Sequence, residues 1–445
     1  MADGNPLSDL TFLGSSNRLA RFIGRPIHRF AAVEAAGGLL MLIATVAALV
    51  WVNSPWQDSY HHFWDTHVAF SVGDYHFDQE LYHIVQDGLM AVFFFVVGLE
   101  IKRELVSGQL RDPRFAALPA ACALGGMVVP ALIYFAFNAG GPGQDGWGIP
   151  MATDIAFAVG VLSLLGDRIP RKMKLFLLTL AIVDDIGAIL VIAIFYAGDL
   201  SGNWLVTSAV LWGAIFLLRR LRVWYLPVYL VLGVAFWLAV LESGVHATIA
   251  GVILGFTTPA KPLQSDAEAC RWAQWLQDKE QILLVDVRRV GFHIRESQPV
   301  SQRIEEMLHP ITSYIIIPVF ALSAAGVELS GEIISDAVSS PVTLGVAIGL
   351  VAGKTVGISL FSWIAARLGL VTIPSSMAGM HMVGVAMVAG IGFTVSLFIS
   401  GLAFDDQVIG DEAKIGILFG SLVAAVAGLA ILSRTERPPF ASDKT

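Results

Sequence analysis

Cysteine and charged residues are scarce in this chain, and their scarcity excludes several classes of protein. Only two cysteines occur among 445 residues, and only 14% of the residues are charged. Two cysteines supply neither a disulfide framework nor a cysteine-based metal site. The patterns HExxH, GxxxxGKS/T and GxSxG are absent as well, and no basic tract indicates nucleic-acid binding. We therefore expect neither an enzyme nor an organic or metal cofactor.

Apolar sequence is abundant instead. Hydrophobic residues make up 56% of the chain, which is more than a soluble core needs. Apolar runs separated by polar residues, glycine or proline start near residues 31, 83, 116, 150, 175, 204, 224, 246, 310, 342, 377 and 413. Runs of this length cross a bilayer as helices. We therefore expect an all-α polytopic membrane protein with about 12 transmembrane helices, in a single domain over residues 31–433.

Lysine and arginine are missing from alternate loops. The segments Asn53–Glu80, Asn138–Ile149 and Val327–Pro341 contain neither residue. The other loops hold the basic residues, namely Lys102, Arg103, Arg111, Arg114, Arg168, Arg171, Lys172, Lys174, Arg219, Arg220, Arg222, those of 261–303, and Arg367. Cytoplasmic loops carry the excess of basic residues, so both termini, 1–30 and 434–445, are expected in the cytoplasm. The first apolar run is too long for a signal peptide.

Two loops have patterns of their own. His67–Phe77 alternates around a turn at Gly73 and Asp74, which predicts a β-hairpin outside the membrane. Exposed strand edges allow pairing with a partner subunit, although the hairpin could equally lie on its own monomer. The cytoplasmic loop 259–309 is long, mixed in charge and partly amphipathic around Cys270–Val290. This loop is expected to form either a surface helix or a flexible insert.

Asp184 and Asp185 lie side by side within the apolar run Leu175–Tyr196. A carboxylate near the bilayer centre disfavours insertion by about 2.5 to 3.5 kcal/mol, so two in succession indicate a function. Both are candidate ligands for a cation. The alternative is a structural ion pair within a helix bundle, but only one basic residue, Lys354, lies inside a run to neutralise two acids.

A few further polar groups lie inside the apolar runs. Thr153 and Asp154 supply oxygen atoms, which a hard monovalent cation such as sodium prefers as ligands. Adjacent residues of a helix point about 100° apart, so Asp184 and Asp185 should have different surroundings and different roles. Buried ionisable groups of this kind exchange protons near physiological pH, which suits proton-coupled transport.

The fourth and eleventh runs contain glycine or proline where a continuous helix would prefer neither. They read GIPMATDIAFAVG from Gly148 and MAGMHMVGVAMVAGIGFTVSLFIS from Met377. In the second, a break is expected at Gly390 and Gly392. Where two broken helices meet, their ends carry opposite partial charges. Asp154 and Lys354 are expected to compensate those ends.

Six motifs follow one another along the chain: QDGLMAVFFFVVGLEIKREL from Gln86, ATDIAFAVGVLSLLG from Ala152, LAIVDDIGAI from Leu180, LESGVHATIAGVILGF from Leu241, GKTVGISLF from Gly353 and GIGFTVSLFIS from Gly390. From about Arg29 to Leu432, the chain resembles the NhaA-type bacterial Na+/H+ antiporters. That family is itself a known example of inverted-topology repeats with broken helices. The resemblance therefore implies spans three to five repeated in spans ten to twelve, with two discontinuous helices crossing at the midplane of the bacterial inner membrane.

The resemblance also assigns roles to residues. It implies that Asp185 is a principal site of sodium and proton binding, and that Asp184 joins it and can pair with Lys354. Thr153 and Asp154 match the broken fourth helix. The protein would then be a secondary antiporter that exports sodium, or lithium, in exchange for protons. Two protons per sodium would make transport respond to voltage. A homodimer formed through the external hairpin is also expected.

A cytoplasmic cluster is a further implication of the resemblance. The candidate pH-sensing residues are Glu100, Arg103, Glu104 and Glu305, which would otherwise be interpreted as an ordinary solvated loop face. Gln302 and Glu306 stand where the family usually has Lys and His, and the preceding loop is longer than usual, so the pH profile is left open. His246 and Asp87 also match family residues, but we leave both outside the core site.

Two other functions use related residues. An intramembrane aspartyl protease also has two membrane-embedded aspartates, but its catalytic carboxylates face each other from separate helices, whereas neighbours in one helix diverge. A cation symporter or channel without exchange is the third hypothesis. Lys354 inside the membrane is unfavourable for a continuously open cation pore.

Overall fold

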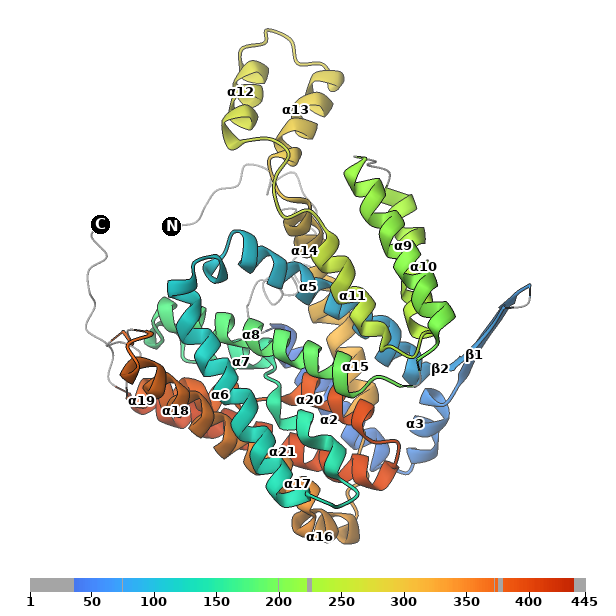
Figure 1. Ribbon diagram of the computed structural model, residues 1–445, viewed down its shortest axis with the longest axis vertical. Coiled ribbons are helices and arrows are strands. Elements are labelled where there is room, and N and C mark those ends of the chain that lie inside the picture. The colour runs from blue at the N-terminus through green and yellow to red at the C-terminus, as the bar shows by residue number, and fades with distance from the viewer. Residues whose placement is uncertain are drawn as a thin grey trace, which may run out of the picture.

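The computed structural model describes residues 36–435, except residues 74, 199, 222–225, 372 and 375–378. The predicted N-terminal segment 1–30 and most of the predicted tail, from residue 436, lie outside the described residues. Figure 1 shows a body of packed helices with two projections, a β-hairpin and a helical hairpin. The predicted all-α membrane class is confirmed by this helical body and its apolar helices.

The first half of the chain contains α2 (Ala36–Val52), α3 (Gln57–Trp64), β1 (His67–Val72), β2 (Tyr75–Glu80), α4 (Leu81–His83), the π-helical η3 (Ile84–Leu89), α5 (Met90–Val106), α6 (Pro113–Asn138), η5 (Gln144–Met151), α7 (Ile155–Ser163), α8 (Arg171–Phe195) and α9 (Gly202–Arg220). The second half contains α10 (Leu226–Leu241), α11 (Ala247–Thr257), α12 (Asp266–Gln277), α13 (Leu284–Glu296), α14 (Val300–Ile311), η7 (Thr312–Ile316), α15 (Ile317–Ala324), α16 (Gly331–Ser339), α17 (Pro341–Ile348), η8 (Gly349–Gly353), α18 (Lys354–Arg367), α19 (Met380–Ala389), α20 (Phe393–Ala403) and α21 (Gln407–Arg434). 

Within the described residues, eight continuous helical stretches are long and apolar enough to cross a membrane, and two bent helix pairs raise that number to ten. The bent pairs are α2 with α3, at 117°, and α19 with α20, at 46°. Two shorter apolar helices follow one another at Pro227–Leu241 and Ala247–Thr257. The chain is therefore a multi-pass membrane protein.

Glycine lets the long helices approach one another closely. A Cβ atom at Gly125 of α6 would lie only 2.3 Å from the carbonyl oxygen of Gly357 in α18. A Cβ atom at Gly251 of α11 would lie 2.1 Å from the carbonyl oxygen of Ala91 in α5. Helices inside a membrane associate through such close packing, because lipid provides no hydrophobic driving force between them. These contacts hold α6 against α18 and α11 against α5.

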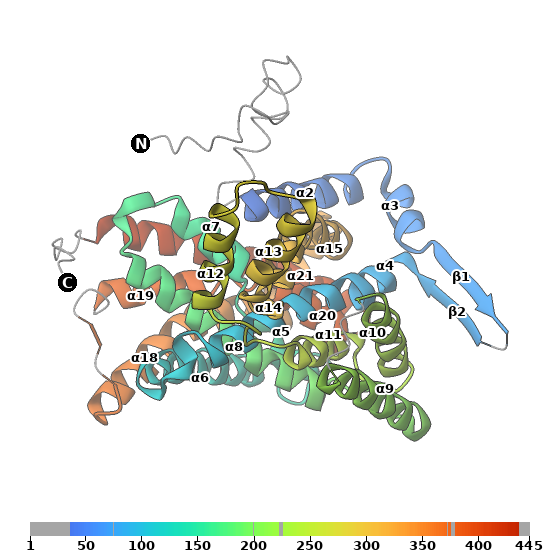
Figure 2. The ribbon, with the colours of Figure 1, turned by 90° about the horizontal axis from the view of Figure 1, so that it is seen from above.

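The β-hairpin forms as the alternating pattern predicts, and its strands extend to Glu80. β1 and β2 are antiparallel, with His67 opposite Glu80 and Val72 opposite Tyr75. Figures 1 and 2 show the hairpin projecting away from the helical body. Its two strands pair only with each other among the described residues, so both outer edges are open.

The loop 259–309 is helical, as one of the two expectations has it, but it forms two separate helices, α12 and α13, and the start of α14 rather than a single surface helix. The amphipathic stretch Cys270–Val290 does not form one helix, because residues 278–283 separate α12 from α13. The ninth span also begins about ten residues before the predicted start near 310. The first part of this span is the polar sequence VSQRIEEMLHPI of α14, so no apolar run indicates where the span begins.

Candidate functional site

Three predicted site residues meet in a buried cluster. Lys354 Nζ donates a hydrogen bond to Asp184 Oδ2 at 2.5 Å and to Thr153 Oγ1 at 2.9 Å. The hydroxyl of Thr153 lies 2.7 Å from Asp184 Oδ2 and 2.8 Å from the carbonyl oxygen of Ala389. A hydroxyl has one proton, so Thr153 donates to one of these two acceptors at a time. The cluster connects α8, α18 and the segments next to α7 and α19.

The backbone before Lys354 explains its position. The π-helical segment η8 ends at Gly353, and π-bulges often mark functional sites in helices. A Cβ atom at Gly353 would lie 2.8 Å from the Cα atom of Pro130, and one at Gly349 would lie 2.8 Å from the Cβ atom of Pro150. Two glycines thus allow this turn to pack directly against two prolines, which brings Lys354 next to Asp184.

Asp154 lies where two interrupted helical segments meet. Its Oδ1 accepts from the backbone N–H of Phe157 at 2.9 Å and caps α7. Its Oδ2 accepts from the backbone N–H of Thr394 at 3.1 Å and from the Thr394 hydroxyl at 2.6 Å. The Asp154 N–H donates to the carbonyl oxygen of Ile391 at 2.7 Å. One carboxylate thus compensates the positive N-terminal ends of both α7 and α20.

Lys354 is expected to compensate the opposite helix ends, and the structure shows it hydrogen-bonded to one of them only through Thr153. Its two hydrogen bonds go to Asp184 and Thr153, and Thr153 is the residue that contacts the carbonyl end of α19. Thr394 was not among the predicted site residues. Its position directly after the Gly390-Ile391-Gly392 break was the available signal, because hydroxyl and carboxylate groups satisfy exposed helix ends.

The two adjacent aspartates have different surroundings. Asp184 is fully buried and paired with Lys354, although its Oδ1 has no hydrogen-bond partner. Asp185 is 5% exposed, and no described residue donates a hydrogen bond to its carboxylate. The carboxylates of Asp184, Glu100 and Asp154 act on it electrostatically, and the ammonium of Lys354 opposes them. A structural ion pair therefore accounts for Asp184, whereas Asp185 forms no ion pair with any described residue.

The four candidate pH-sensing residues also come together, between α5 and α14. Arg103 lies 2.5 Å from Glu305, 3.8 Å from Glu104 and 3.9 Å from Glu100. Glu305 Oε2 is buried without a partner. The two departures from the family pattern lie on the exposed side of α14, where Gln302 donates to Glu306 at 3.1 Å. Of the four candidate residues, Glu100 also interacts electrostatically with Asp185.

His246 and Asp87 lie outside this cluster. His246 precedes α11, and its ring Nε2 hydrogen-bonds the carbonyl oxygen of Tyr196. The backbone carbonyl of Asp87, in η3, accepts from Trp237 at 3.1 Å. Both residues thus contact the surrounding helices.

Comparison with known proteins identifies the family. The model of the family described as Na+/H+ antiporter 1 matches residues 28–432. The protein named Na(+)/H(+) antiporter NhaA 3 from Frankia alni is 48% identical, over 94% of this chain and 91% of its own length. The Na(+)/H(+) antiporter NhaA of Rhodopirellula baltica is 47% identical, over 93% and 95%. The chain therefore belongs to the Na+/H+ antiporter 1 family, whose members are transporters rather than enzymes.

Proposed function

We propose that this protein exchanges sodium, or lithium, for protons across the membrane, and that Asp184 and Asp185 bind both kinds of ion. The observation that carries this proposal is the unpaired carboxylate of Asp185, buried beside an aspartate that Lys354 already neutralises. An unpaired buried carboxylate is unfavourable unless it takes up a proton or a cation. The names of the relatives at 44 to 48% identity support the same pair of substrates.

Competition for the same oxygen atoms provides the coupling. Asp184 Oδ1, both oxygens of Asp185 and the Thr153 hydroxyl supply the oxygen ligands that a sodium ion prefers. A proton on either carboxylate removes a ligand and a negative charge, so sodium and protons exclude each other. If both could bind at once, neither gradient would drive the other.

Exchange of two protons for one sodium moves one net charge in each cycle. Asp185 holds one of these protons, and the Asp184–Lys354 pair holds the other. Transport then responds to the membrane potential by about 2.3 kcal/mol per 100 mV. A potential that is negative inside favours uptake of the extra positive charge, so voltage as well as the proton gradient drives sodium export.

The helices form an inverted repeat in this proposal. The ten spans, counted with both bent pairs, and the two shorter apolar helices would make twelve crossings of the bacterial inner membrane, with both termini in the cytoplasm. The interrupted segments at 152–154 and 390–392 would then cross at the midplane, where Asp154 balances two helix ends. Rocking of one bundle against the other would expose the aspartate pair to each side in turn.

Regulation by pH and assembly into a dimer complete the proposal. Glu100, Arg103, Glu104 and Glu305 would set the pH at which exchange begins, because protonation of the acids releases Arg103 and loosens α14 from α5. The open edges of β1 and β2 would pair with the hairpin of a second copy.

Sodium-dependent proton flux in proteoliposomes tests the central proposal. Wild-type protein should dissipate an acid-inside gradient when sodium or lithium is added, and Asp185→Asn should abolish this response. Asp58→Asn, at an exposed residue of α3, is the matched control and should exchange normally. Undiminished exchange by Asp185→Asn would refute the site.

Two measurements on the purified wild-type protein distinguish antiport from the rival functions. An antiporter releases protons when sodium is added to the detergent-solubilised protein, whereas a symporter or channel without exchange does not. Cleavage of a membrane peptide by the purified protein would support the aspartyl protease instead.

A further inference from the structure

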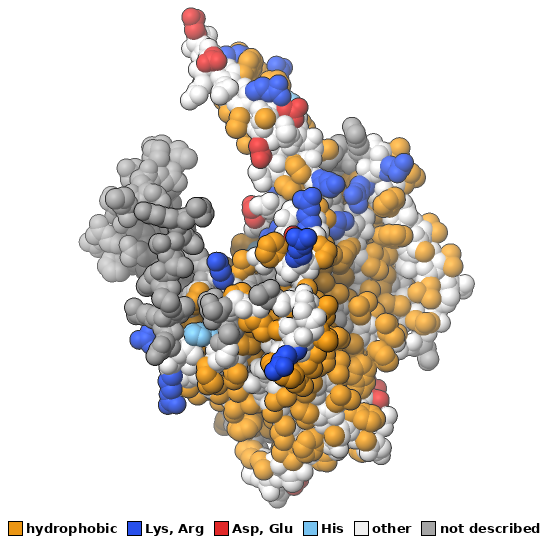
Figure 3. Space-filling model, turned by 60° about the vertical axis from the view of Figure 1, so that its left-hand side comes forward, with side chains coloured by type: hydrophobic (Ala, Val, Ile, Leu, Met, Phe, Trp, Pro, Cys, Tyr) orange, Lys and Arg blue, Asp and Glu red, His pale blue; other side chains and the backbone are white. Residues whose placement is uncertain are grey.

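The helical hairpin formed by α12 and α13 has no part in the proposed exchange reaction. In Figure 1 it stands beyond the end of the helical body, and in Figure 2 both helices lie over the body rather than beside it. Figure 3 shows a band of lysine and arginine side chains between the apolar surface of the body and the hairpin. The hairpin is therefore held away from the lipid-facing surface.

The hairpin has a packed interior of its own. The ring of Trp272 in α12 stacks on that of His293 in α13, with centroids 4.1 Å apart. Lys279 pairs with the carboxylate of Asp286 at 2.8 Å, and the ammonium also lies 4.3 Å from the centroid of the Trp275 ring. These contacts orient α12 and α13 relative to each other, so the hairpin presents a defined outer surface.

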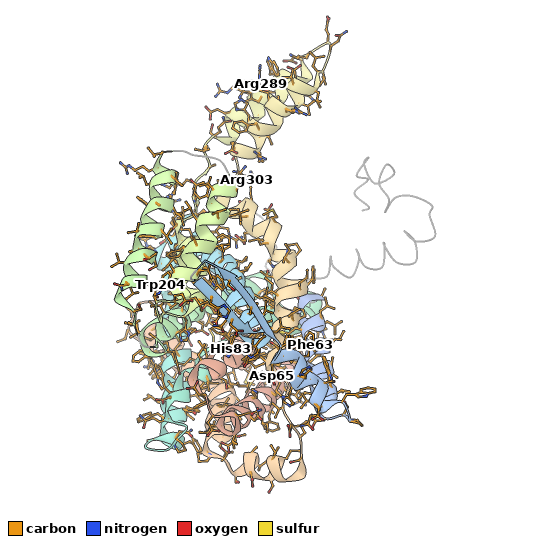
Figure 4. The ribbon with its side chains drawn as sticks, turned by 90° about the vertical axis from the view of Figure 1, so that its right-hand side faces the viewer. Phe63, Asp65, His83, Trp204, Arg289 and Arg303 are labelled. Carbon is orange, nitrogen blue, oxygen red and sulfur yellow. The ribbon has the colours of Figure 1, made fainter. Side chains whose placement is uncertain are left out.

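The base of the hairpin is fastened to α14. The N–H of Leu263 donates to the carbonyl oxygen of Glu296 at 3.1 Å, and the N–H of Ser301 donates to that of Pro259 at 3.0 Å. The buried carboxylate of Glu296 accepts from Arg303 of α14 at 3.0 Å. Figure 4 shows Arg303 at this junction and Arg289 on the hairpin itself. The hairpin is thus anchored to the body by backbone and side-chain bonds.

The outer face of α13 is apolar along both sides and basic along its middle. Val287 and Ile294 lie on one side, and Val285 and Phe292 on the other, each a helical repeat of seven residues apart. Leu284, which is 68% exposed, lies between them in line with Arg288 and Arg295. Exposed apolar residues combined with arginine are typical of protein interfaces. No described residue covers this surface.

Gly291 lies in the middle of the same face. A Cβ atom at Gly291 would meet no atom within 4 Å, so packing inside the protein does not require glycine there. Glycine in a helix interior is less favourable than alanine. A missing side chain between two arginines leaves a notch into which another helix can fit closely.

We propose that the α13 face, Leu284–Arg295, is a docking site for an amphipathic helix of another protein, whose apolar side is flanked by acidic residues. Acidic side chains on the partner would neutralise Arg288 and Arg295, and its backbone would approach Gly291. A lipid surface fits less well for two reasons. The hairpin lies beyond the basic band, and binding to lipid does not require a recess between two arginines. This proposal is independent of the ion chemistry.

A fluorophore on Cys270 provides the measurement. Cys270 is exposed on α12 and Cys122 is buried, so the full-length protein can be labelled at one position. The probe is a synthetic helical peptide of about 20 residues with a leucine face flanked by glutamate. A peptide of the same composition in scrambled order is the control. We expect saturable binding of the amphipathic peptide only.

Substitutions on and beside the face sharpen the test. Gly291→Leu fills the notch and Arg288→Glu reverses the charge, and each should weaken binding by about tenfold or more. Arg289→Glu is the matched control, because Arg289 points away from the middle of the face, and it should bind as the wild type does. All three variants should retain sodium-dependent proton flux.

Three results would overturn the proposal. They are equal binding of the scrambled peptide, a fluorescence response to phosphatidylglycerol vesicles in place of the peptide, and a response that depends only on the concentration of the labelled protein. The second result would assign the face to the membrane surface, and the third to a second copy of this chain.

Discussion

Two ion pairs with the same nitrogen–oxygen distance differ in how far their side chains are exposed to solvent. Lys354 and Asp184 lie 2.5 Å apart with both side chains 0% exposed, whereas Arg103 and Glu305 lie 2.5 Å apart with side chains 32% and 11% exposed. A buried charge that loses its partner remains unsolvated, but a partly exposed charge turns to water. The buried pair is therefore suited to holding a site together, and the exposed pair to responding to the solution.

The largest effect is expected from breaking the buried pair. Lys354→Ala leaves the Asp184 carboxylate without its cation, which costs about 3 to 5 kcal/mol in comparable buried pairs. We expect a clear fall in melting temperature in detergent at neutral pH. The double variant Asp184→Asn with Lys354→Met removes both charges and should recover most of the lost stability. A Lys354→Ala protein that melts like the wild type would show that the pair is not closed in solution.

A smaller effect is expected at the neighbouring helix ends. Thr394→Val removes the hydroxyl that donates to Asp154 Oδ2 at 2.6 Å but keeps the size of the side chain. Loss of one hydrogen bond to a buried carboxylate costs about 1 to 3 kcal/mol. Exchange should weaken, and Thr394→Ser should restore both stability and flux. Equal losses in the valine and serine variants would assign the effect to packing instead.

Loss of the partly exposed pair should change the pH dependence of exchange more than it changes the stability of the protein. Arg103→Gln removes the cation between Glu100, Glu104 and Glu305. The Arg103 side chain is 32% exposed, so its loss should lower stability less than the loss of the fully buried Lys354 does. Without Arg103, Glu100 and Glu305 lose the charge that favours their ionised forms. The pH profile of sodium-dependent flux should therefore move to the alkaline side. An unchanged profile would mean that the cluster is only a solvated surface.

The smallest effect is expected at the hairpin, where the pair is most exposed. His67 and Asp78 lie 2.9 Å apart with side chains 62% and 44% exposed. The hydrogen bond and charge of Asp78 raise the pKa of His67, so the pair is complete at acidic pH and is lost as the pH rises through that raised value. Asp78→Asn should return the pKa of His67 to its ordinary range in an NMR titration, without a measurable change in melting temperature.

The contrast between buried and exposed charges also explains which site residues the sequence predicts. Asp184, Asp185, Asp154 and Lys354 were found because charged residues inside apolar runs are rare, and Thr153 because it adjoins one of them. The pairing of Lys354 with Asp184 followed from the family resemblance. It could not follow from spacing, since the two residues are far apart in the chain and meet through the packing of η8 against prolines.

Other features carried no signal that a search for apolar runs detects. The helix α14 is polar, so the apolar pattern does not indicate its start before residue 310. The separation of α12 from α13 depends on the contacts between these two helices. The position of Thr394 after the Gly390-Ile391-Gly392 break indicates a helix end, but its partner Asp154 is known only from the structure. Composition predicted the helices, and tertiary contacts determined the site.

Calorimetric titration of the purified protein with sodium over a range of pH tests the central claim most directly. If sodium and protons compete for Asp184 and Asp185, the apparent affinity should weaken by about tenfold per pH unit for each competing proton as the solution becomes acidic. Protons should be released on binding, and Asp185→Asn should not bind sodium. Equal affinity for sodium from acidic to alkaline solution would contradict the account.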